Sequence, residues 1–433
     1  MYMRMPEERQ KIVGKLIKVH RKEKLRITNS AKWTQRGFSK DVCSPTSLIK
    51  LEKGMLPRFY DVFEKIAKKF EWGVAYDPFV ERKIERYIVQ VRGACELGDV
   101  EMIQQALNIC FAALKPVKDC IWYNDWYTML KLVENYYIKE IFVEMEHRDY
   151  YHEMMELHGG IWEELMKNVL FNSAFMDVQS SDYRDLYRYY GFDQMKDTCY
   201  NYINGMLFSL SRNNSEMFKK LFKAAERRFL KKKNFIRLMD VYNLALIFAG
   251  FFDKNDIDDL VGKLVKLASM KSLPKTKVAD LYFILGTIYY DLKEYEKALK
   301  ILEGCYEYDV NRSHCPYLLV GNINHLREKE ANIPFYNEEE LKKTTVDNQR
   351  IYRYYAMDKG DFTCYEKQEY LMNEILPTIG PEDDLTLDVL ASELDMLVVK
   401  TKKIEDVAVF NEVRNSLLYG IVYQTPHEKT EDL

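Results

Sequence analysis

Proline and glycine are scarce in this chain, since 433 residues include 11 prolines and 18 glycines, against 32 tyrosines. Turn-rich sheet proteins draw on both residues, so their scarcity favours long helices. The eight cysteines are scattered and include no CxxC pair, so they match neither a zinc site nor a disulfide framework. We therefore expect reduced thiols, as in a cytosolic protein.

Long apolar runs are also missing, and we expect no secretory leader. The N-terminus, MYMRMPEERQ, is charged where a signal peptide needs an apolar segment. The longest apolar run, residues 241–252, contains Asn243 and is too short to cross a bilayer. With 47% hydrophobic and 30% charged residues, the composition predicts a cytoplasmic globular protein with no membrane partner. Its length predicts two or more domains.

Motifs of catalysis and metal binding are absent as well. The sequence has no glycine-rich phosphate loop, no GxSxG turn and no paired-carboxylate motif. His147, His152 and His158, with Glu144 and Glu153, could suggest a metal site. However, they lack HExxH spacing, and a step of five residues does not place two ligands on one helix face. We expect surface histidines, no metal, no cofactor and no enzymatic activity.

The net charge of −3 conceals an uneven distribution. Residues 1–72 hold 18 Lys and Arg against 8 Asp and Glu, a balance of +10. The remaining residues hold 46 and 59, a balance of −13. A basic N-terminal part joined to an acidic body is typical of a protein that binds phosphate groups at one end. The alternative to phosphate binding is that these lysines only form a solvated face of the protein.

Residues 34–54, TQRGFSKDVCSPTSLIKLEKG, contain the pattern of two short helices. The apolar pairs Phe38/Val42 and Leu48/Leu51 have helical spacing. Thr34 and Ser44 are suited to cap the two helices, with Pro45 in the first turn of the second and Gly54 after its end. The spacing predicts a helix-turn-helix that binds double-stranded DNA.

The rest of the chain predicts helical hairpins that repeat. Residues 279–305 place Gly286 and Ala298 where two helices of a hairpin would approach each other, with Leu302 beside them. Small residues recur at 205, 245, 286 and 321, each on an expected helix. The fold class predicted is all-α: an N-terminal helix-turn-helix domain followed by an α-solenoid of degenerate TPR-like helical hairpins.

The motif Thr34-Gln35-x-x-Phe38-Ser39-x-x-Val42-Cys43-x-x-Thr46-x-Leu48-x-x-Leu51-Glu52-x-Gly54 resembles the XRE-type helix-turn-helix. With the helical body, it resembles the RRNPP group of peptide-pheromone-responsive regulators. The resemblance is close only in residues 34–70, and the longer connection at 25–33 departs from it; that connection could be an extra helical turn or a basic wing. The domains expected are a DNA-binding head (1–72), a linker (73–80), a peptide-binding and dimerisation body (81–420) and a polar tail (421–433).

In such a head, the start of the second helix enters the major groove. The residues expected to contact bases or phosphates are Gln35, Arg36, Ser44, Pro45, Thr46, Ser47, Lys50, Lys53 and Arg58. Lys50 is the best suited to guanine, and the resemblance implies that Gln35 touches the backbone or a base at the edge of the groove. The alternative is that residues 44–47 only cap a helix.

The resemblance also implies a short linear signalling peptide in the concave groove of the body. The residues expected there are Tyr202, Asn204, Tyr242, Asn243, Phe283, Thr287, Tyr290, Asn322 and His325. Asn side chains can pair with a peptide backbone, and aromatic rings can flank its side chains. Packing between hairpins explains each residue equally well. 

The function predicted is therefore a quorum-sensing-type transcription regulator, active as a homodimer. A helical scaffold with a DNA-tethering head is the alternative. A regulator of another enzyme, resembling the phosphatase-type members of the wider group, is weaker because those proteins lack a DNA-binding head.

Overall fold

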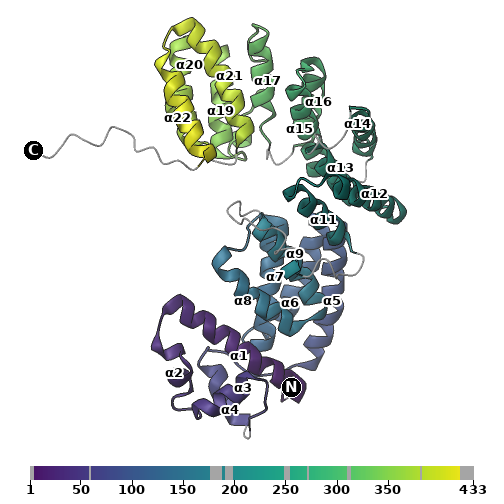
Figure 1. Cartoon of the computed structure of the whole chain (residues 1–433), viewed down its shortest axis with the longest axis vertical. Helices are drawn as coiled ribbons and strands as arrows, with labels where there is room; N and C mark the ends of the chain where they lie inside the picture. The colour runs from purple at the N-terminus through teal and green to yellow at the C-terminus, as the bar shows by residue number, and fades with distance from the viewer. Residues whose placement is uncertain are drawn as a thin grey trace, which may run out of the picture. The chain divides into compact units, whose positions relative to one another are not determined.

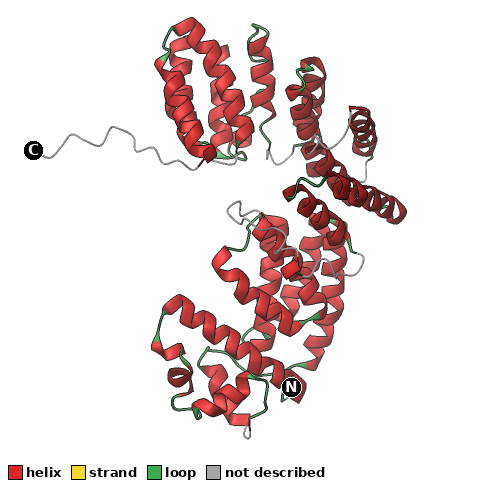
Figure 2. Ribbon diagram, viewed as in Figure 1, coloured by secondary structure: helices red, strands yellow, loops and turns green. Residues whose placement is uncertain are grey.

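The structure, a computed structural model, describes residues 4–57, 60–175, 188–190, 198–247, 254–270, 273–309, 314–380 and 383–419. Within these ranges the protein is all-α, and its helices pack as consecutive hairpins (Figures 1 and 2). An isolated β-bridge joins Gly73 to Cys120. The predicted all-α class is confirmed. Among these described helices, none has the length and apolar character needed to span a membrane.

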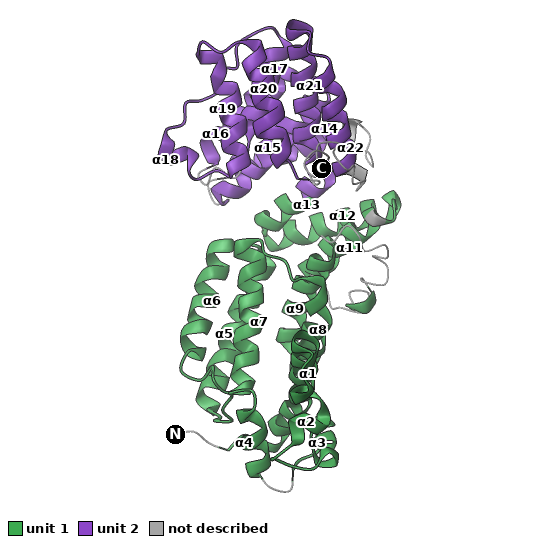
Figure 3. Ribbon diagram, turned by 90° about the vertical axis from the view of Figure 1, so that its left-hand side faces the viewer, with its two compact units in different colours: residues 1–241 green, residues 242–433 purple. Residues whose placement is uncertain are grey.

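The chain divides into two compact units, residues 1–241 and 242–433 (Figure 3). The helices that begin in the first unit are α1 (Glu7–Thr28), η1 (Ala31–Trp33), α2 (Gln35–Ser39), α3 (Pro45–Glu52), α4 (Tyr60–Lys68), α5 (Pro78–Leu97), α6 (Val100–Leu114), α7 (Ile121–Lys139), α8 (Met145–His158), α9 (Gly160–Phe175), α11 (Cys199–Ser211), α12 (Ser215–Lys232) and α13 (Phe235–Ile247).

The second unit begins within α13. Its further helices are α14 (Lys254–Ala268), α15 (Lys275–Asp291), α16 (Tyr295–Tyr308), α17 (Pro316–Leu326), α18 (Glu338–Leu341), α19 (Val346–Ala356), η3 (Met357–Lys359), α20 (Cys364–Tyr370), η4 (Leu371–Ile375), η5 (Leu376–Thr378), α21 (Asp384–Thr401) and α22 (Glu405–Tyr419).

The α15–α16 hairpin confirms the role predicted for its small residues. A Cβ atom added at Gly286 would lie 2.4 Å from Leu302, so the two helices approach too closely for any side chain there. Ala298 and Leu302 on α16 are fully buried. The close approach explains why glycine is found in the middle of a helix, where it otherwise costs about 1 kcal/mol relative to alanine.

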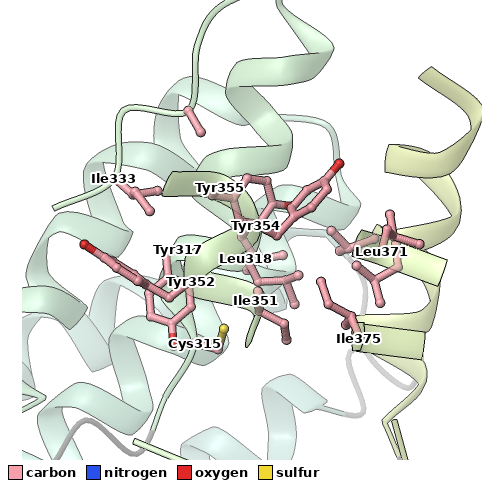
Figure 4. Packing of buried hydrophobic residues seen from close by; sticks show 14 of the residues in the cluster. Cys315, Tyr317, Leu318, Ile333, Ile351, Tyr352, Tyr354, Tyr355, Leu371 and Ile375 are labelled. Carbon is pink, nitrogen blue, oxygen red and sulfur yellow. The ribbon is translucent and has the colours of Figure 1, made fainter. Parts of the chain in front are cut away.

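The core of the second unit is rich in tyrosine (Figure 4). Tyr317 of α17 packs edge-on against Tyr352 of α19, with ring centroids 5.5 Å apart. Tyr354 and Tyr355 are fully buried beside Leu371. Their hydroxyl groups therefore need partners inside the protein, and these partners form the polar network described below.

In the first unit, α1 packs against α3 on one side and α8 on another. Beneath α1, the His20 ring lies 2.9 Å from Asp125 of α7 and 2.9 Å from the Tyr150 hydroxyl of α8. The second Asp125 oxygen meets His158 at 3.2 Å. Burial disfavours the charged Asp125 carboxylate, but His20 and His158 outweigh burial and lower the pKa of Asp125. A buried charged group thus joins the first helix to the helices that follow it.

The expectation of surface histidines is wrong for two of the three. The His158 side chain is fully buried, and Trp126 donates an N–H to it at 3.1 Å. His152 is also buried and stacks on Tyr189 with centroids 4.3 Å apart. Both rings pack against aromatic side chains, and His158 also contacts the buried Asp125.

All five tryptophans, Trp33, Trp72, Trp122, Trp126 and Trp162, belong to the first unit. Trp126 stacks on Trp162 at 5.1 Å in the interior of this unit. Trp33 packs on Phe70 at 5.1 Å and so closes the small core formed by α1 to α4. Large aromatic rings bury much surface per residue and account for a large share of core stability.

The connection at residues 25–33 is an extra helical turn. The first helix extends to Thr28 and ends at Asn29 in a left-handed conformation, followed by the turn η1. The predicted linker at 73–80 is ordered here, because the Gly73 N–H donates to Asp119 O at 2.7 Å and α5 begins at Pro78. The boundaries proposed at 72 and 80 remain predictions, and residues 421–433 lie outside the described ranges.

Candidate functional site

Two short helices, α2 and α3, carry the candidate DNA-contacting residues. The Thr34 hydroxyl accepts the Gly37 N–H at 3.1 Å and caps α2. The Ser44 hydroxyl accepts the Ser47 N–H at 3.1 Å and caps α3, with Pro45 in its first turn. Each cap satisfies a backbone donor that the helix leaves unpaired. Both predicted helix starts are confirmed.

The end of the first of these helices differs from the prediction. The pair Phe38/Val42 has helical spacing, but α2 ends at Ser39. The Val42 N–H donates to Ser39 O at 3.1 Å, so Val42 lies in the turn. Asp41, at φ 65°, reverses the chain before α3. Aspartate adopts this left-handed conformation more readily than most residues. The chain therefore forms a turn after Ser39 and does not continue the α2 helix.

A buried carboxylate, Glu52, holds the two helices together. Arg21 of α1 donates to both Glu52 oxygens, at 2.6 and 3.1 Å, and also to Trp33 O at 2.9 Å. Gln35 of α2 donates to the same carboxylate at 3.1 Å. Arg21 and Glu52 are both buried, 5% and 4% exposed. The bidentate pair joins α1 to α3 with a defined geometry, and Gln35 joins α2 to the same carboxylate. The Gln35 amide, expected at the groove edge, is engaged inside the head.

The outward face of α3 carries most of the remaining candidates. Its apolar residues Leu48 and Leu51 are buried against the head, whereas the opposite face is exposed. The predicted residues that are exposed are Arg36, Ser44, Pro45, Thr46, Ser47, Lys50 and Lys53. Arg58 lies outside the described residues. The structure therefore leaves a polar and basic surface of one helix available to a partner.

Two of the expected peptide-contacting residues, Asn204 and Tyr202, lie in the first unit, and their side chains contact neighbouring helices. Asn204 of α11 is buried and donates to Asn168 Oδ1 at 3.0 Å, while Asn172 donates to Asn204 at 3.4 Å. Tyr202 is half-buried, with the Arg228 guanidinium 5.6 Å from its ring centroid. Asn204 thus belongs to a chain of amides between helices.

Four more of these residues lie in the second unit, but not in one cluster. Tyr242 is buried below the Lys263 ammonium, 5.9 Å from its ring centroid. Asn243 is buried, and its side-chain oxygen has no hydrogen-bond partner within the described ranges. Phe283 stacks on His314 at 5.0 Å, and the Thr287 hydroxyl donates to Phe283 O. The geometry does not bring these four residues together.

Tyr290, Asn322 and His325 do meet, in a buried polar network. The Tyr290 hydroxyl donates to Asn322 Oδ1 at 2.7 Å, and Asn322 Nδ2 donates to Glu393 of α21 at 2.7 Å. His325 lies between two carboxylates, 2.7 Å from Glu393 and 2.6 Å from Asp358. Burial lowers the pKa of His325, but the two carboxylates outweigh burial and raise its pKa to about 9.

Further groups complete this network. The hydroxyl groups of Tyr354 and Tyr355 donate to Glu393 at 2.8 and 3.2 Å. Lys367 of α20 pairs with Asp358, and the backbone N–H of Ala331 donates to the same carboxylate at 2.7 Å. Two carboxylates thus face an imidazole and an ammonium. Full pairing offsets the cost of burying these groups.

A pocket of about 490 Å³ adjoins the network. The network residues in its wall include His325, Asp358 and Lys367, and its apolar wall includes Phe362, Met396 and Leu397. A mixed polar and apolar lining of this size suits a small molecule or a peptide segment. Sequence reasoning missed Asp358, Lys367 and Glu393, because a carboxylate or ammonium on an amphipathic helix normally faces solvent. Glu393 lies between Leu390 and Leu394, which places it beside the buried stripe.

Within the described ranges, one group of acidic and histidine side chains converges as metal ligands would, but its surroundings disfavour a cation. Glu144, Glu146 and His147 converge within 4.8 Å of one another, but the two carboxylates are exposed. His147 is already 2.7 Å from Glu23, and the Arg26 guanidinium lies 3.0 Å from the same ring nitrogen. The positive charge of Arg26 at that distance disfavours binding of a metal cation.

Comparisons with protein-family models, with curated proteins and with solved structures found no match for this chain.

Proposed function

We propose that the protein is a transcription regulator that binds double-stranded DNA through α2 and α3, acting as a helix-turn-helix. The observation that carries the proposal is the exposed N-terminal face of α3, held in place by the buried Arg21–Glu52 pair and Gln35. Thr46, Ser47 and Lys50 on this face offer the donors and acceptors that base edges can pair with. The +10 balance of residues 1–72 supports phosphate binding by the same part of the chain.

The DNA half is tested by selection from a library of random duplexes. We expect one enriched motif, bound with a strong dependence on salt. Changing Arg36 and Lys50 together to alanine should lower affinity for that motif about tenfold or more. Lys220→Ala, on the exposed face of α12, is the matched control and should bind like the wild type. The absence of any enriched motif would contradict the proposal, as would undiminished binding by the double variant.

The regulatory half of the proposal is that a short linear peptide binds the helical body, a degenerate TPR-like solenoid, and changes how a homodimer engages DNA. The pocket beside His325 supports it, because His325 and Glu393 line the pocket, and Glu393 also binds Asn322, which in turn accepts a hydrogen bond from Tyr290. A ligand can shift DNA binding only through different affinities for two arrangements of the protein. The protein would act in the cytoplasm, and the proposal includes no catalytic step and no cofactor.

This half is tested with synthetic peptides encoded by short reading frames beside the gene. One of them should raise the unfolding temperature and change the affinity for DNA. If these peptides change neither quantity while DNA is still bound, the alternative gains support, namely a helical scaffold whose head tethers a protein partner to DNA. Sedimentation of the protein, alone and with the duplex, tests the expected homodimer.

A further inference from the structure

A row of basic residues follows one face of α1. Lys11, Lys15, Lys18, Lys22 and Arg26 are separated by steps of four, three, four and four residues, and all are exposed. Steps of three and four place side chains on the same side of a helix. The opposite side of α1 packs into the head, so this row is a continuous cationic stripe about four turns long.

A matching row of acidic residues follows α8. Glu146, Asp149, Glu153 and Glu156 are separated by three, four and three residues, and all are exposed. The two helices contact each other in the first unit. Arg26 lies 3.3 Å from Glu146 and Lys22 lies 3.7 Å from Glu153. Because residue numbers fall along α1 as they rise along α8, the helices run antiparallel with their charges facing.

The two halves of the basic row differ. Lys22 and Arg26 have carboxylate partners, whereas Lys11, Lys15 and Lys18 form no ion pair within 4.0 Å across the described ranges. At this end a cavity of about 380 Å³ separates the helices. Lys15 and Lys18 line it, while Glu153 and Glu156 line it from α8. The acidic row therefore approaches these ammonium groups without neutralising them.

The unpaired half also continues into α3. Lys53, at the end of α3, lines the same cavity. A Cβ atom added at Gly54 would lie 3.0 Å from Lys15 Cε and 3.1 Å from Lys11 O, so the end of α3 touches α1 here. Lys50 is one turn earlier on α3 and is exposed. The ammonium groups thus extend from the face expected to read bases to the side of α1.

We propose that Lys11, Lys15 and Lys18, together with Lys53, bind the phosphate backbone of double-stranded DNA, and that Glu153 and Glu156 of α8 compete with the phosphates for these ammonium groups. This inference rests on the proposed function, because it assumes that α3 approaches DNA. Phosphates are the natural counterions of a lysine row, since each contact releases condensed cations from the duplex. The carboxylates lower the local potential, and the salt already present in solution screens this effect only in part across a few ångströms.

The test uses the full chain and a fluorescent duplex of mixed sequence about three helical turns long, because phosphate contacts do not depend on sequence. Affinity is measured by anisotropy from low to physiological salt. For Lys15→Ala and Lys18→Ala combined, the slope of log affinity against log salt should fall by about 2, since each phosphate contact contributes about 0.9. Lys24→Ala, on the same helix but outside the row, is the matched control and should keep the wild-type slope.

The second measurement uses Glu153→Gln with Glu156→Gln, which should raise the affinity for the same duplex several-fold. Far-UV circular dichroism confirms that each variant is folded, as expected for exposed side chains. If the wild type binds no duplex even at low salt, the proposed function fails. If the wild type binds but the lysine variant keeps its slope, or the glutamine variant gains no affinity, this inference fails while the proposed function stands.

Discussion

At the scale of single residues, Glu52 connects the helices of the head, because its side chain on α3 binds residues of α1 and α2. Its carboxylate receives hydrogen bonds from Arg21 and Gln35, and it is buried together with Arg21. Neither partner could be read from the sequence, since Arg21 lies among the lysines of an amphipathic helix, where a charged side chain is expected on the solvated face. Burial of a single charged pair depends on how three segments meet, and the spacing of residues within one segment does not contain that information.

We expect Glu52→Gln to destabilise the protein by about 3 kcal/mol, because the buried Arg21 guanidinium would lose its counter-charge. Urea unfolding followed by circular dichroism measures the change. Glu64→Gln, an exposed glutamate on α4, should change stability by less than about 0.5 kcal/mol. Equal effects of the two substitutions would show that the pair contributes no more than a surface contact.

His325 makes stability depend on pH. Its pKa in the folded protein is about 9, whereas an unperturbed histidine has a pKa of about 6.5. The stabilisation is therefore complete below about pH 6.5 and is lost as the pH rises through about 9, with a size on the order of 3 kcal/mol. Unfolding in urea at about pH 6 and about pH 9.5 measures the loss. The His325→Gln variant should be less stable than the wild type at the lower pH, and its stability should change less between the two pH values. An unchanged pH dependence of stability would contradict this account.

The residues expected to contact a peptide show what sequence reasoning can and cannot reach. The repeat register predicts that Tyr290, Asn322 and His325 share one concave face, and a peptide site there stays a prediction. In the structure Tyr290 binds Asn322, and both Asn322 and His325 bind Glu393. Their partners Glu393 and Asp358 are 33 to 71 residues away along the chain. Since these carboxylates already occupy the donors of Asn322 and His325, the polar groups open to a ligand are fewer than the sequence suggested.

At the scale of elements, a glycine in α17 sets a helix contact. A Cβ atom added at Gly321 would lie 2.3 Å from the Tyr355 ring. We expect Gly321→Ala to destabilise the second unit by about 1–3 kcal/mol, because overpacking outweighs the better helix propensity of alanine.

Gly262→Ala in α14 is the matched control for this substitution. The added Cβ atom has no neighbour within 4 Å there, so alanine should stabilise the helix by up to about 1 kcal/mol. Urea unfolding followed by circular dichroism measures both variants. Stabilisation by both substitutions would mean that α17 and α19 can separate without cost.

The helices themselves were largely predictable from spacing and caps. Thr34 and Ser44 begin α2 and α3 as expected, and Gly54 has the predicted left-handed conformation, with φ 80°. The end of α2 at Ser39 was missed because the spacing of Phe38 and Val42 fits a helix and a compact turn equally well. Caps mark where a helix starts more sharply than apolar spacing marks where it ends.

At the scale of the whole molecule, the charge boundary near residue 72 and the packing boundary at 241 differ. Composition changes where the predicted head ends, but His20 of α1 contacts Asp125 of α7 and Tyr150 of α8. Tertiary contacts of this kind follow from the complete arrangement of helices. A change in composition indicates a change of role, whereas compact units are defined by which surfaces are buried together.

The placement of the tryptophans gives the protein an internal optical reporter. All five belong to residues 1–241, and the unit that holds the pocket beside His325 contains none. Indole emission therefore records the surroundings of the first unit alone. A peptide bound beside His325 should change that emission only if binding is transmitted along the chain to the unit that carries α3. Titration of the intact, unlabelled protein with the peptide would thus distinguish two events. Calorimetry detects occupancy of the pocket, and tryptophan fluorescence detects a change in the first unit.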